Sequence, residues 1–237
     1  MKFVVSMLAV GIGFLVFEHL HTQFPNHANV QQPVSDVLSE KIENQPLARI
    51  VLEQLTVKGR APKTGYARSE FGDGWARVDG CDMRNIMLGR YLTDKKTDEA
   101  GCIVYSGVLA DVYTAKTITF VRGAETSDDV QIDHVVALSD AWQKGAQQLP
   151  FEQREQFAND PLNLIPVDGD TNQKKGDSDA ASWLPPNKDF RCQYVARQIA
   201  VKSKYHLWVT EAEKVAMLRV LNGCGEQVLP VESAKTS

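Results

Sequence analysis

The sequence of 237 residues lacks an excess of positive charge, because 26 Lys and Arg residues face 30 Asp and Glu residues and the formal net charge is −4. A global positive field therefore cannot attract an acidic partner, and any affinity for nucleic acid must come from a local patch or a metal. The sequence also lacks a Gly-x-Ser-x-Gly motif, a Walker loop and any Cys-x-x-Cys pair. Serine hydrolase, NTPase, thiol oxidoreductase and structural zinc-site functions are thus without support.

The composition shows no strong bias toward one residue class, with 43% hydrophobic residues, 24% charged residues, 16 Gly and 10 Pro. These values exclude collagen-like, coiled-coil and wholly disordered proteins. A mean hydropathy of −0.27 excludes a multi-span membrane protein. The length and apolar content predict one domain of catalytic size, over residues 46–226, followed by a flexible tail over 227–237.

The longest apolar run, Phe3–Phe17, is uncharged and follows Lys2. It is short for a membrane-spanning helix and typical of the apolar core of a signal peptide. We therefore interpret residues 1–28 as a signal peptide, with an uncleaved N-terminal anchor as the alternative, and expect a secreted protein without other stable membrane association. The polar residues 29–45 are expected to form a linker.

Four cysteines, Cys81, Cys102, Cys192 and Cys224, agree with export, because an even number in a secreted chain usually means disulfide bonds. Four cysteines allow three connectivities, and the sequence alone does not choose among them. We expect neighbours to pair, Cys81 with Cys102 and Cys192 with Cys224, because each pair brackets a compact helix-and-turn unit.

Apolar periodicity predicts a mixture of helices and short strands. Leu47, Ile50, Val51 and Leu55 recur at helical spacing and predict a helix that opens the domain. The other expected elements are a helix after Cys81, strands at 102–105, 108–112, 117–121, 130–136 and 161–167, and helices at 138–147, 151–157, from 170 or 171 onward, 190–205 and 210–221.

Polar residues interrupt two of these apolar strands. Asp133 and His134 lie in the first, which is an expensive place for a carboxylate and an imidazole unless they are paired or bind something. Asn163 lies in the second, where Asn is disfavoured unless its amide bridges backbone groups. Asn172 and Lys175 then share one helical face. Each has an ordinary structural explanation when taken alone, but together they predict a ββα unit with inward-pointing ligands.

This ordered set resembles the HNH endonucleases of the ββα-metal, or His-Me finger, superfamily, and more closely the secreted HNH proteins related to the C-terminal domain of GmrSD. The resemblance covers about residues 65–224 and implies an α+β fold, with a ββα-metal core at about 130–182 embedded in a mostly helical domain with short antiparallel strands. The matching passages are Gln131–Leu138, Ala141–Trp142, Phe157–Leu164, Asn172–Asp177 and Trp183–Pro186, and more weakly Tyr66–Arg68, Phe71–Gly72, Trp75 and Cys81.

The resemblance also implies a role for each matching residue. His134 corresponds to the general base, and Asp133 and Asn172 correspond to the metal ligands. Asn163 matches the central Asn that braces the loop around the histidine. Asn172 replaces the name-giving histidine at the third motif position and keeps an oxygen ligand there. Lys175 falls where a basic residue can contact the phosphate.

These roles are consistent with metal-dependent hydrolysis of phosphodiester bonds. Mg²⁺, with Mn²⁺ or Ca²⁺ as alternatives, accepts oxygen ligands from one or two side chains and keeps several waters. His134, with an unperturbed pKa of about 6.5, can accept the proton of the attacking water near neutral pH. We therefore predict a secreted, monomeric, largely sequence-nonspecific endonuclease of DNA, with RNA as the alternative substrate, that leaves 5′-phosphate and 3′-hydroxyl ends.

A local excess of positive charge between residues 188 and 204 predicts the surface that contacts nucleic acid, because five basic residues accompany one acid, Asp189. Phosphate contacts from such a stripe are independent of base sequence and sensitive to salt. A solvated helix face is the alternative explanation. The five residues are Lys188, Arg191, Arg197, Lys202 and Lys204.

Two other functions compete with the nuclease. Asp168, Asp170, Asn172 and Asp179 occupy positions one, three, five and twelve of an EF-hand-like calcium loop, although Gln173 stands where that loop needs Gly. The second competitor is a non-catalytic adhesion or cell-envelope module with a degenerate motif. The intact motif residues argue against it.

Overall fold

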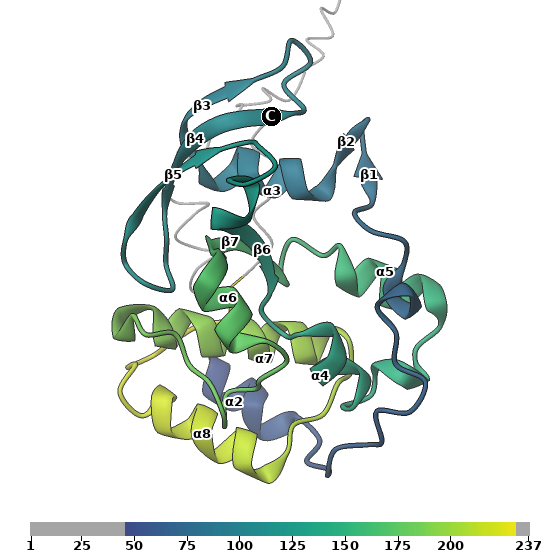
Figure 1. The fold of residues 1–237 in the computed structure, drawn as a ribbon. Helices are drawn as coiled ribbons and strands as arrows, with labels where there is room; N and C mark the ends of the chain where they lie inside the picture. Colours follow the sequence, from purple (N-terminus) through teal and green to yellow (C-terminus); the bar gives the residue numbers. More distant parts are fainter. Residues whose placement is uncertain (1–45, 231–237) are drawn as a thin grey trace, which may run out of the picture. The chain divides into compact units, whose positions relative to one another are not determined.

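The computed structural model of the protein describes residues 46–230. The expected signal segment, 1–28, the linker, 29–45, and residues 231–237 of the tail lie outside the described residues. Within the described range, none of the helices is both long and apolar enough to cross a membrane. Figure 1 shows an α+β architecture, which confirms the predicted fold class.

Short helices and short strands alternate along this part of the chain. The helices are α2 (Ala48–Gln54), α3 (Met83–Tyr91), α4 (Leu138–Trp142), α5 (Phe151–Ala158), α6 (Gly169–Lys175), α7 (Arg191–Lys204) and α8 (Glu211–Leu221). The strands are β1 (Arg77–Val78), β2 (Cys81–Asp82), β3 (Thr93–Thr97), β4 (Val104–Ala110), β5 (Thr117–Val121), β6 (Val130–His134) and β7 (Leu164–Asp168). They form three antiparallel sheets, β1–β2, β3–β4–β5 and β6–β7.

The β6–β7 hairpin and α6 form a ββα unit. The two strands pair so that His134, the last residue of β6, lies opposite Leu164, the first residue of β7. Asp168 ends β7 and caps α6, because its carboxylate accepts a hydrogen bond from the first turn of that helix at 2.8 Å. The helix can start there only with Gly169, since a Cβ at this position would lie 1.9 Å from the carbonyl oxygen of Asp128.

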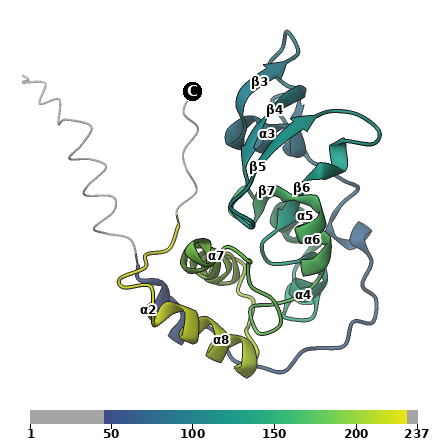
Figure 2. The same cartoon turned by 60° about the vertical axis from the view of Figure 1, so that its left-hand side comes forward.

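The hairpin lies between two hydrophobic clusters. Val130 and Leu164 pack with α3 and the β3–β4–β5 sheet, whereas Ile165 packs with α2, α4, α5, α7 and α8. Figures 1 and 2 show α3 and that sheet on one side of the hairpin and α2, α7 and α8 on the other. A strand that is buried on both faces is expected to be apolar nearly throughout. The polar residues Asp133 and His134 in β6 therefore need partners inside the protein.

The structure differs from the expected elements between residues 92 and 145. Periodicity does not reveal β3, because all five residues of this edge strand are polar and exposed. β4 runs unbroken through Gly107, where we expect a turn from the sequence. A Cβ at Gly107 would lie 2.9 Å from Leu92 and 3.0 Å from the carbonyl oxygen of Thr93, so this glycine allows close packing. α4 ends at Trp142 rather than 147, and the chain turns at Gly145, whose φ is +121°.

The folded part of the chain continues past residue 226, the expected end of the domain. The N–H of Ala48 donates to the carbonyl oxygen of Gln227 at 2.8 Å, and the N–H of Leu229 donates to that of Pro46 at 3.0 Å. Leu229 is also buried in the larger hydrophobic cluster. The expected flexible tail therefore does not begin at residue 227.

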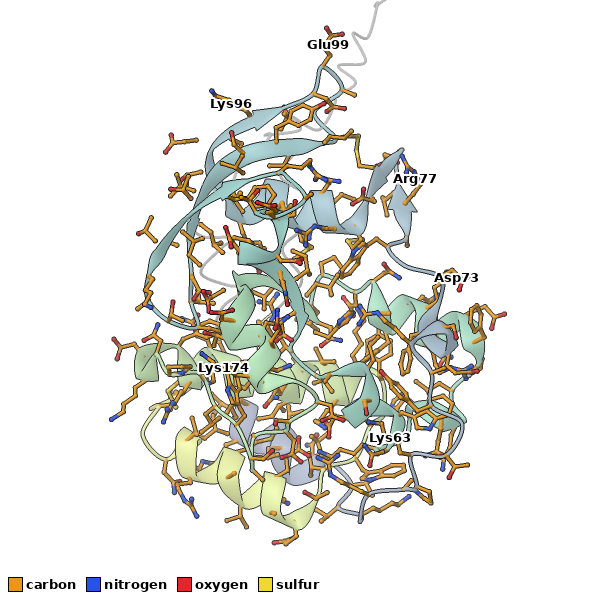
Figure 3. All side chains as sticks on the ribbon, viewed as in Figure 1. Lys63, Asp73, Arg77, Lys96, Glu99 and Lys174 are labelled. Atoms are coloured by element: carbon orange, nitrogen blue, oxygen red, sulfur yellow. A yellow bond between two sulfur atoms is a disulfide. The ribbon has the colours of Figure 1, made fainter. Side chains whose placement is uncertain are left out.

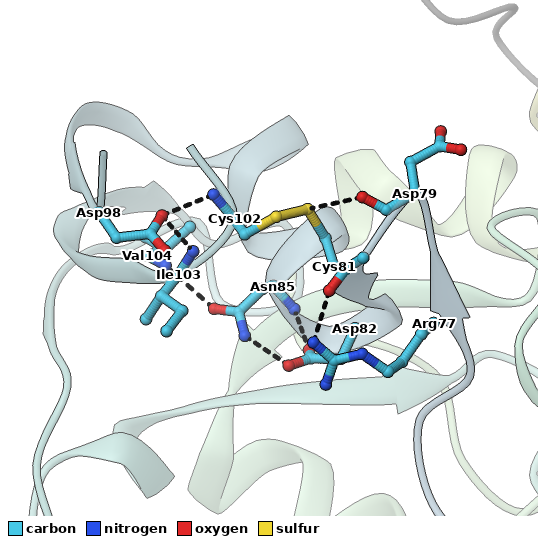
Figure 4. Close-up of a disulfide and its surroundings, with 10 residues drawn as sticks. Arg77, Asp79, Cys81, Asp82, Asn85, Asp98, Cys102, Ile103 and Val104 are labelled. Atoms are coloured by element: carbon cyan, nitrogen blue, oxygen red, sulfur yellow. Dashed lines mark hydrogen bonds between the residues drawn. A yellow bond between two sulfur atoms is a disulfide. The ribbon is translucent and has the colours of Figure 1, made fainter. Parts of the chain in front are cut away.

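Two disulfides join Cys81 to Cys102 and Cys192 to Cys224, which is the pairing of neighbours. Figure 4 shows the first bond, which ties β2 to the segment before β4. Asp98 fixes that segment, because its carboxylate accepts hydrogen bonds from the N–H groups of Cys102 and of the next residue at 2.7 and 2.8 Å. The second bond ties the start of α7 to the chain that follows α8.

Two lysines in the helical part are fully buried and are neutralised by carboxylates. Lys144 Nζ lies 2.7 Å from both Asp179 and Glu213 and 2.8 Å from Asp140. Lys202 Nζ lies 3.0 Å from Glu213 and 3.4 Å from Asp140. Burial alone raises the pKa of Asp179, but the hydrogen bond and the charge of Lys144 lower it to about 2. This ion cluster joins α4, α7 and α8 to the segment after α6.

We expect replacement of both Cys192 and Cys224 by serine to lower the free energy of unfolding by about 3–4 kcal/mol, because the bond closes a long loop in the unfolded chain. Urea unfolding under non-reducing conditions measures the difference from the wild type. As a control, thiol titration of the unfolded, unreduced wild type should find all four cysteines oxidised. A free cysteine in stoichiometric amount would contradict this expectation.

Candidate functional site

Asp133 lies inside the protein with a partner on each carboxylate oxygen. Its side chain is 5% exposed, and Lys175 Nζ lies 2.8 Å from Oδ1. The hydroxyl of the fully buried Tyr113 donates a short hydrogen bond to Oδ2. Burial raises the pKa of Asp133, while Lys175 and Tyr113 act in the opposite direction. These two partners also fix the orientation of the carboxylate.

His134 is held in one orientation by two neighbours. Nε2 lies 2.8 Å from the carbonyl oxygen of Ala158, and because a carbonyl can only accept, Nε2 bears the proton and Nδ1 is the basic nitrogen. The indole ring of Trp75 stacks on the imidazole, with centroids 5.8 Å apart and planes 7° apart. Burial lowers the pKa of His134 to about 3, against the opposing effect of the Ala158 carbonyl. The imidazole is therefore neutral at physiological pH.

Asn163 joins two parts of the segment between β6 and β7, one near Val136 and the other near Phe157. Its Oδ1 accepts from the N–H of Val136 at 2.8 Å, and its Nδ2 donates to the carbonyl oxygens of Val136 and Phe157 at 3.3 and 3.4 Å. The side chain is fully buried. These contacts agree with the bracing role that the resemblance implies.

Asn172 lies on α6 and faces the same cavity as Asp133 and His134. Its Nδ2 donates to Gln131 Oε1 at 3.0 Å, so that Oδ1 is the atom not used in this bond. The cavity has a volume of about 280 Å³, and its wall also contains Tyr66, Arg68, Ser139 and Asp177. Asn172, which is 38 positions from His134 in the sequence, thus lines one hollow with His134 and the adjacent Asp133.

A second hollow of about 150 Å³ lies on another side of His134. It is lined by Phe71, Gly72, Gly74, Trp75 and Ala158, together with residues of the first hollow. The residues shared by both hollows are Arg68, His134 and Leu138.

The structure corrects the role expected for Lys175. Its side chain is fully buried, and Nζ lies 2.8 Å from Asp133 Oδ1 and donates to the carbonyl oxygen of His134 at 2.8 Å. An ammonium group that is enclosed and held by two partners is not available to a phosphate in the substrate. Lys175 instead balances the buried charge of Asp133.

Two residues of the predicted basic stripe are also occupied inside the protein. Lys202 is fully buried in the ion cluster with Glu213. Arg197 donates from Nε to the carbonyl oxygen of Leu162 at 2.7 Å and from Nη2 to that of Pro161 at 2.9 Å, which holds the turn before β7. Lys202 and Arg197 therefore make structural contacts inside the protein and not the contacts with nucleic acid that we expected.

The other three residues of the stripe are exposed or half-buried, and their contact with nucleic acid stays a prediction. Lys188 is exposed, Arg191 is half-buried and donates to the carbonyl oxygen of Pro185 at 2.8 Å, and Lys204 pairs with Asp160 at 2.8 Å. Counting charges along α7 does not reveal which side of the helix is buried. For this reason the predicted stripe wrongly includes Lys202 and Arg197, which bind partners inside the protein.

The calcium-loop alternative is overturned by the structure. Asp168 caps α6, and Asp170 and Asn172 lie within that helix rather than in a loop. Asp179 is buried between Lys144 and the Arg60 side chain, at 2.7 and 2.8 Å. The four oxygen side chains therefore do not surround one ion.

Three residues beside the site have no role in the sequence prediction. Arg68 begins a short 3-10 helix, Arg68–Phe71, and Trp75 lies in the glycine-rich loop that follows it. Nothing in the local sequence indicates that either residue lies close to His134. Tyr113 follows β4 and reaches Asp133 from 20 positions away in the sequence. Long-range contacts of this kind leave no local periodic signal.

The residues present fit a hard divalent cation that keeps most of its waters. Asp133 and Asn172 both line one cavity and carry side-chain oxygens, and a carboxylate that accepts two hydrogen bonds has further lone pairs. Lys175 favours the ionised form of Asp133, which such binding requires. In the part of the chain that the structure describes, no group of three or more His, Cys, Asp or Glu side chains is placed to hold a metal ion.

Comparison with known proteins places the chain among nuclease-related domains. Residues 83–220 match the family described as GmrSD restriction endonucleases, C-terminal domain, and the chain belongs to this family. It is also 40% identical over 186 residues to an "Uncharacterized secreted protein" of Arthroderma benhamiae, an alignment that covers 77% of this chain and 87% of the relative. This relative agrees with the secreted localisation expected from residues 1–28. No solved structure matches the chain.

We expect Lys175→Met to lower the free energy of unfolding by about 3–5 kcal/mol, because Asp133 would remain buried without its counter-charge. The neighbouring Lys174 is exposed on α6 (Figure 3), and Lys174→Met should change the stability by less than about 0.5 kcal/mol. Urea unfolding at pH 7 measures both variants. Equal stability of the two would show that Lys175 is not the essential partner of Asp133.

Proposed function

We propose that the protein is a secreted, metal-dependent, largely sequence-nonspecific endonuclease that hydrolyses phosphodiester bonds of DNA, with RNA as a further substrate. The observation that supports this most strongly is the state of His134. It is a neutral, oriented imidazole with Nδ1 as its basic nitrogen, and it shares a cavity with the oxygen donors Asp133 and Asn172. Membership of a restriction-endonuclease family supports the same class of reaction.

In this proposal His134 Nδ1 accepts the proton of the attacking water. The carbonyl of Ala158 and the ring of Trp75 hold the imidazole before substrate arrives, so little reorientation is needed during the reaction. Proton transfer creates an imidazolium, whose charge is attracted by the face of the stacked indole. Asn163 keeps the following chain segment in place. The products carry 5′-phosphate and 3′-hydroxyl ends.

Asp133 and Asn172 are the residues that would hold the divalent cation, with Mg²⁺ as the first candidate and Mn²⁺ or Ca²⁺ as alternatives. When bound, such a cation supplies stabilisation of the negative charge on the leaving 3′ oxygen. Lys175 and Tyr113 keep the Asp133 carboxylate oriented for this task.

A plasmid-nicking assay on the purified exported protein tests the proposal. We expect nicking with Mg²⁺ or Mn²⁺ and none in excess EDTA. His134→Ala should lower the rate by about 10²–10⁴-fold, the range usual for loss of a general base. His206→Asn is the matched control, because His206 is exposed and Asn tolerates its φ of +53°. Equal nicking in EDTA, or a normal rate for His134→Ala, would refute the proposal.

The pH dependence gives an independent prediction. A base acts in its deprotonated form, so the rate falls as the pH falls through its pKa, and the pKa of His134 is about 3. We therefore expect kcat/KM to stay nearly constant from about pH 8 down to about pH 5. An unperturbed histidine would instead lose its basic form near pH 6.5, and the rate would fall there. Initial rates at low substrate concentration measure the profile. A half-maximal rate near pH 6.5 would contradict a buried, neutral His134.

A further inference from the structure

The two hollows beside His134 define a path for an extended substrate. They meet at Arg68, His134 and Leu138, of which only Arg68 and His134 are polar. A nucleic-acid strand that occupies both hollows must pass these side chains. A phosphate bound where the two hollows share their walls would lie beside the side chains of His134 and Arg68.

Arg68 lies on a chain segment that is fixed on both sides. Upstream, Lys63, which is labelled in Figure 3, pairs with Asp177 at 3.1 Å. Downstream, Phe71 is 1% exposed in the larger hydrophobic cluster. Arg154 donates to the carbonyl oxygen and carboxylate of Glu70 at 2.7 and 2.9 Å. The backbone that presents Arg68 is thus held in place before substrate binds.

The charge of Arg68 is not balanced by a neighbour. Lys63 is paired with Asp177, and the buried Lys175 is paired with Asp133. In the described part of the chain, Arg68 is exposed and its side chain takes part in no ion pair or hydrogen bond. The wall of the two hollows therefore presents one uncompensated positive group, and this group lies beside the proposed base.

We propose that Arg68 binds the phosphate group that is cleaved. This inference rests on the proposed nuclease function and adds a residue outside the matched family segment, 83–220. A guanidinium is the side chain best suited to phosphate, because its planar fork donates two parallel hydrogen bonds and keeps its charge at all physiological pH values. The contact would hold the phosphate in the ground state and stabilise the additional negative charge that develops during attack by water.

Three variants of the full exported chain test this role. Arg68→Gln removes the charge with a side chain of similar size, and Arg68→Lys keeps the charge without the planar fork. Arg90→Gln is the matched control, because Arg90 is exposed on α3 and lies outside both hollows. Urea unfolding should give the same midpoint for all three, since neither arginine side chain has a hydrogen-bond or ion-pair partner among residues 46–230.

The first measurement is cleavage with Mg²⁺. We expect Arg68→Gln to lower kcat/KM by about 10²–10³-fold, as for loss of a donor to a developing oxyanion. Arg68→Lys should fall between this variant and the wild type, and Arg90→Gln should match the wild type. The second measurement is binding of a labelled single-stranded oligonucleotide in EDTA at several salt concentrations. The slope of log K against log salt should decrease by about 0.7 for Arg68→Gln, which corresponds to one phosphate contact, and stay unchanged for Arg90→Gln.

The two measurements separate the failure of this inference from the failure of the proposed function. If the wild type cleaves but Arg68→Gln retains the wild-type rate or the wild-type salt slope, Arg68 is not the phosphate-binding residue and the nuclease proposal stands. If the wild type never cleaves yet Arg68→Gln loses one phosphate contact, the nuclease proposal fails while phosphate binding by Arg68 stands. Absence of both cleavage and binding in the wild type would overturn both.

Discussion

The structure depends on how three interior lysines are neutralised. Lys144, Lys175 and Lys202 are fully buried, and an ammonium group without a counter-charge in such a place would cost several kcal/mol. Lys144 and Lys202 can be satisfied only when α4, α7, α8 and the segment after α6 bring their carboxylates to one point. Lys175 can be satisfied only when α6 packs against β6 next to Asp133. The arrangement of the helices and of the ββα unit is therefore tied to charge pairing as well as to apolar packing.

The same requirement orders the site. Because Lys175 and Tyr113 occupy the two oxygens of Asp133, the carboxylate has one orientation, and the strand that bears it has one register against β7. His134 follows at the end of that strand, where the Ala158 carbonyl fixes the tautomer of its ring. A neutral imidazole costs much less to bury than an imidazolium, which is why the interior lowers the pKa of His134. Burial thus keeps the residue in its deprotonated form at neutral pH.

The sequence predicts those parts of the fold that local physics determines. Apolar spacing identifies α2, α3, α5, α7 and α8 and the two strands of the hairpin. Polar residues within apolar strands, and their order along the chain, identify the candidate site residues Asp133, His134, Asn163 and Asn172. The polar edge strand β3 and the burial of Lys202 have no local signal, because pairing with β4 and contact with distant carboxylates decide them. For the same reason Tyr113 is found only when the folded chain brings it to Asp133.

The site is built from two segments of the chain. The matched family segment, 83–220, supplies Asp133, His134 and Asn172, which the β6–β7 hairpin and α6 hold in place. The segment before it supplies Arg68 and Trp75. This segment is attached by the ion pair of Arg60 with Asp140 in α4 and by the ion pair of Lys63 with Asp177 after α6. The buried Phe71 also attaches it to the core. The ββα unit alone would leave His134 open on the face that Trp75 covers, without the stacked ring that restrains the imidazole. The oriented, desolvated state of His134 is therefore a property of the loop and the core together.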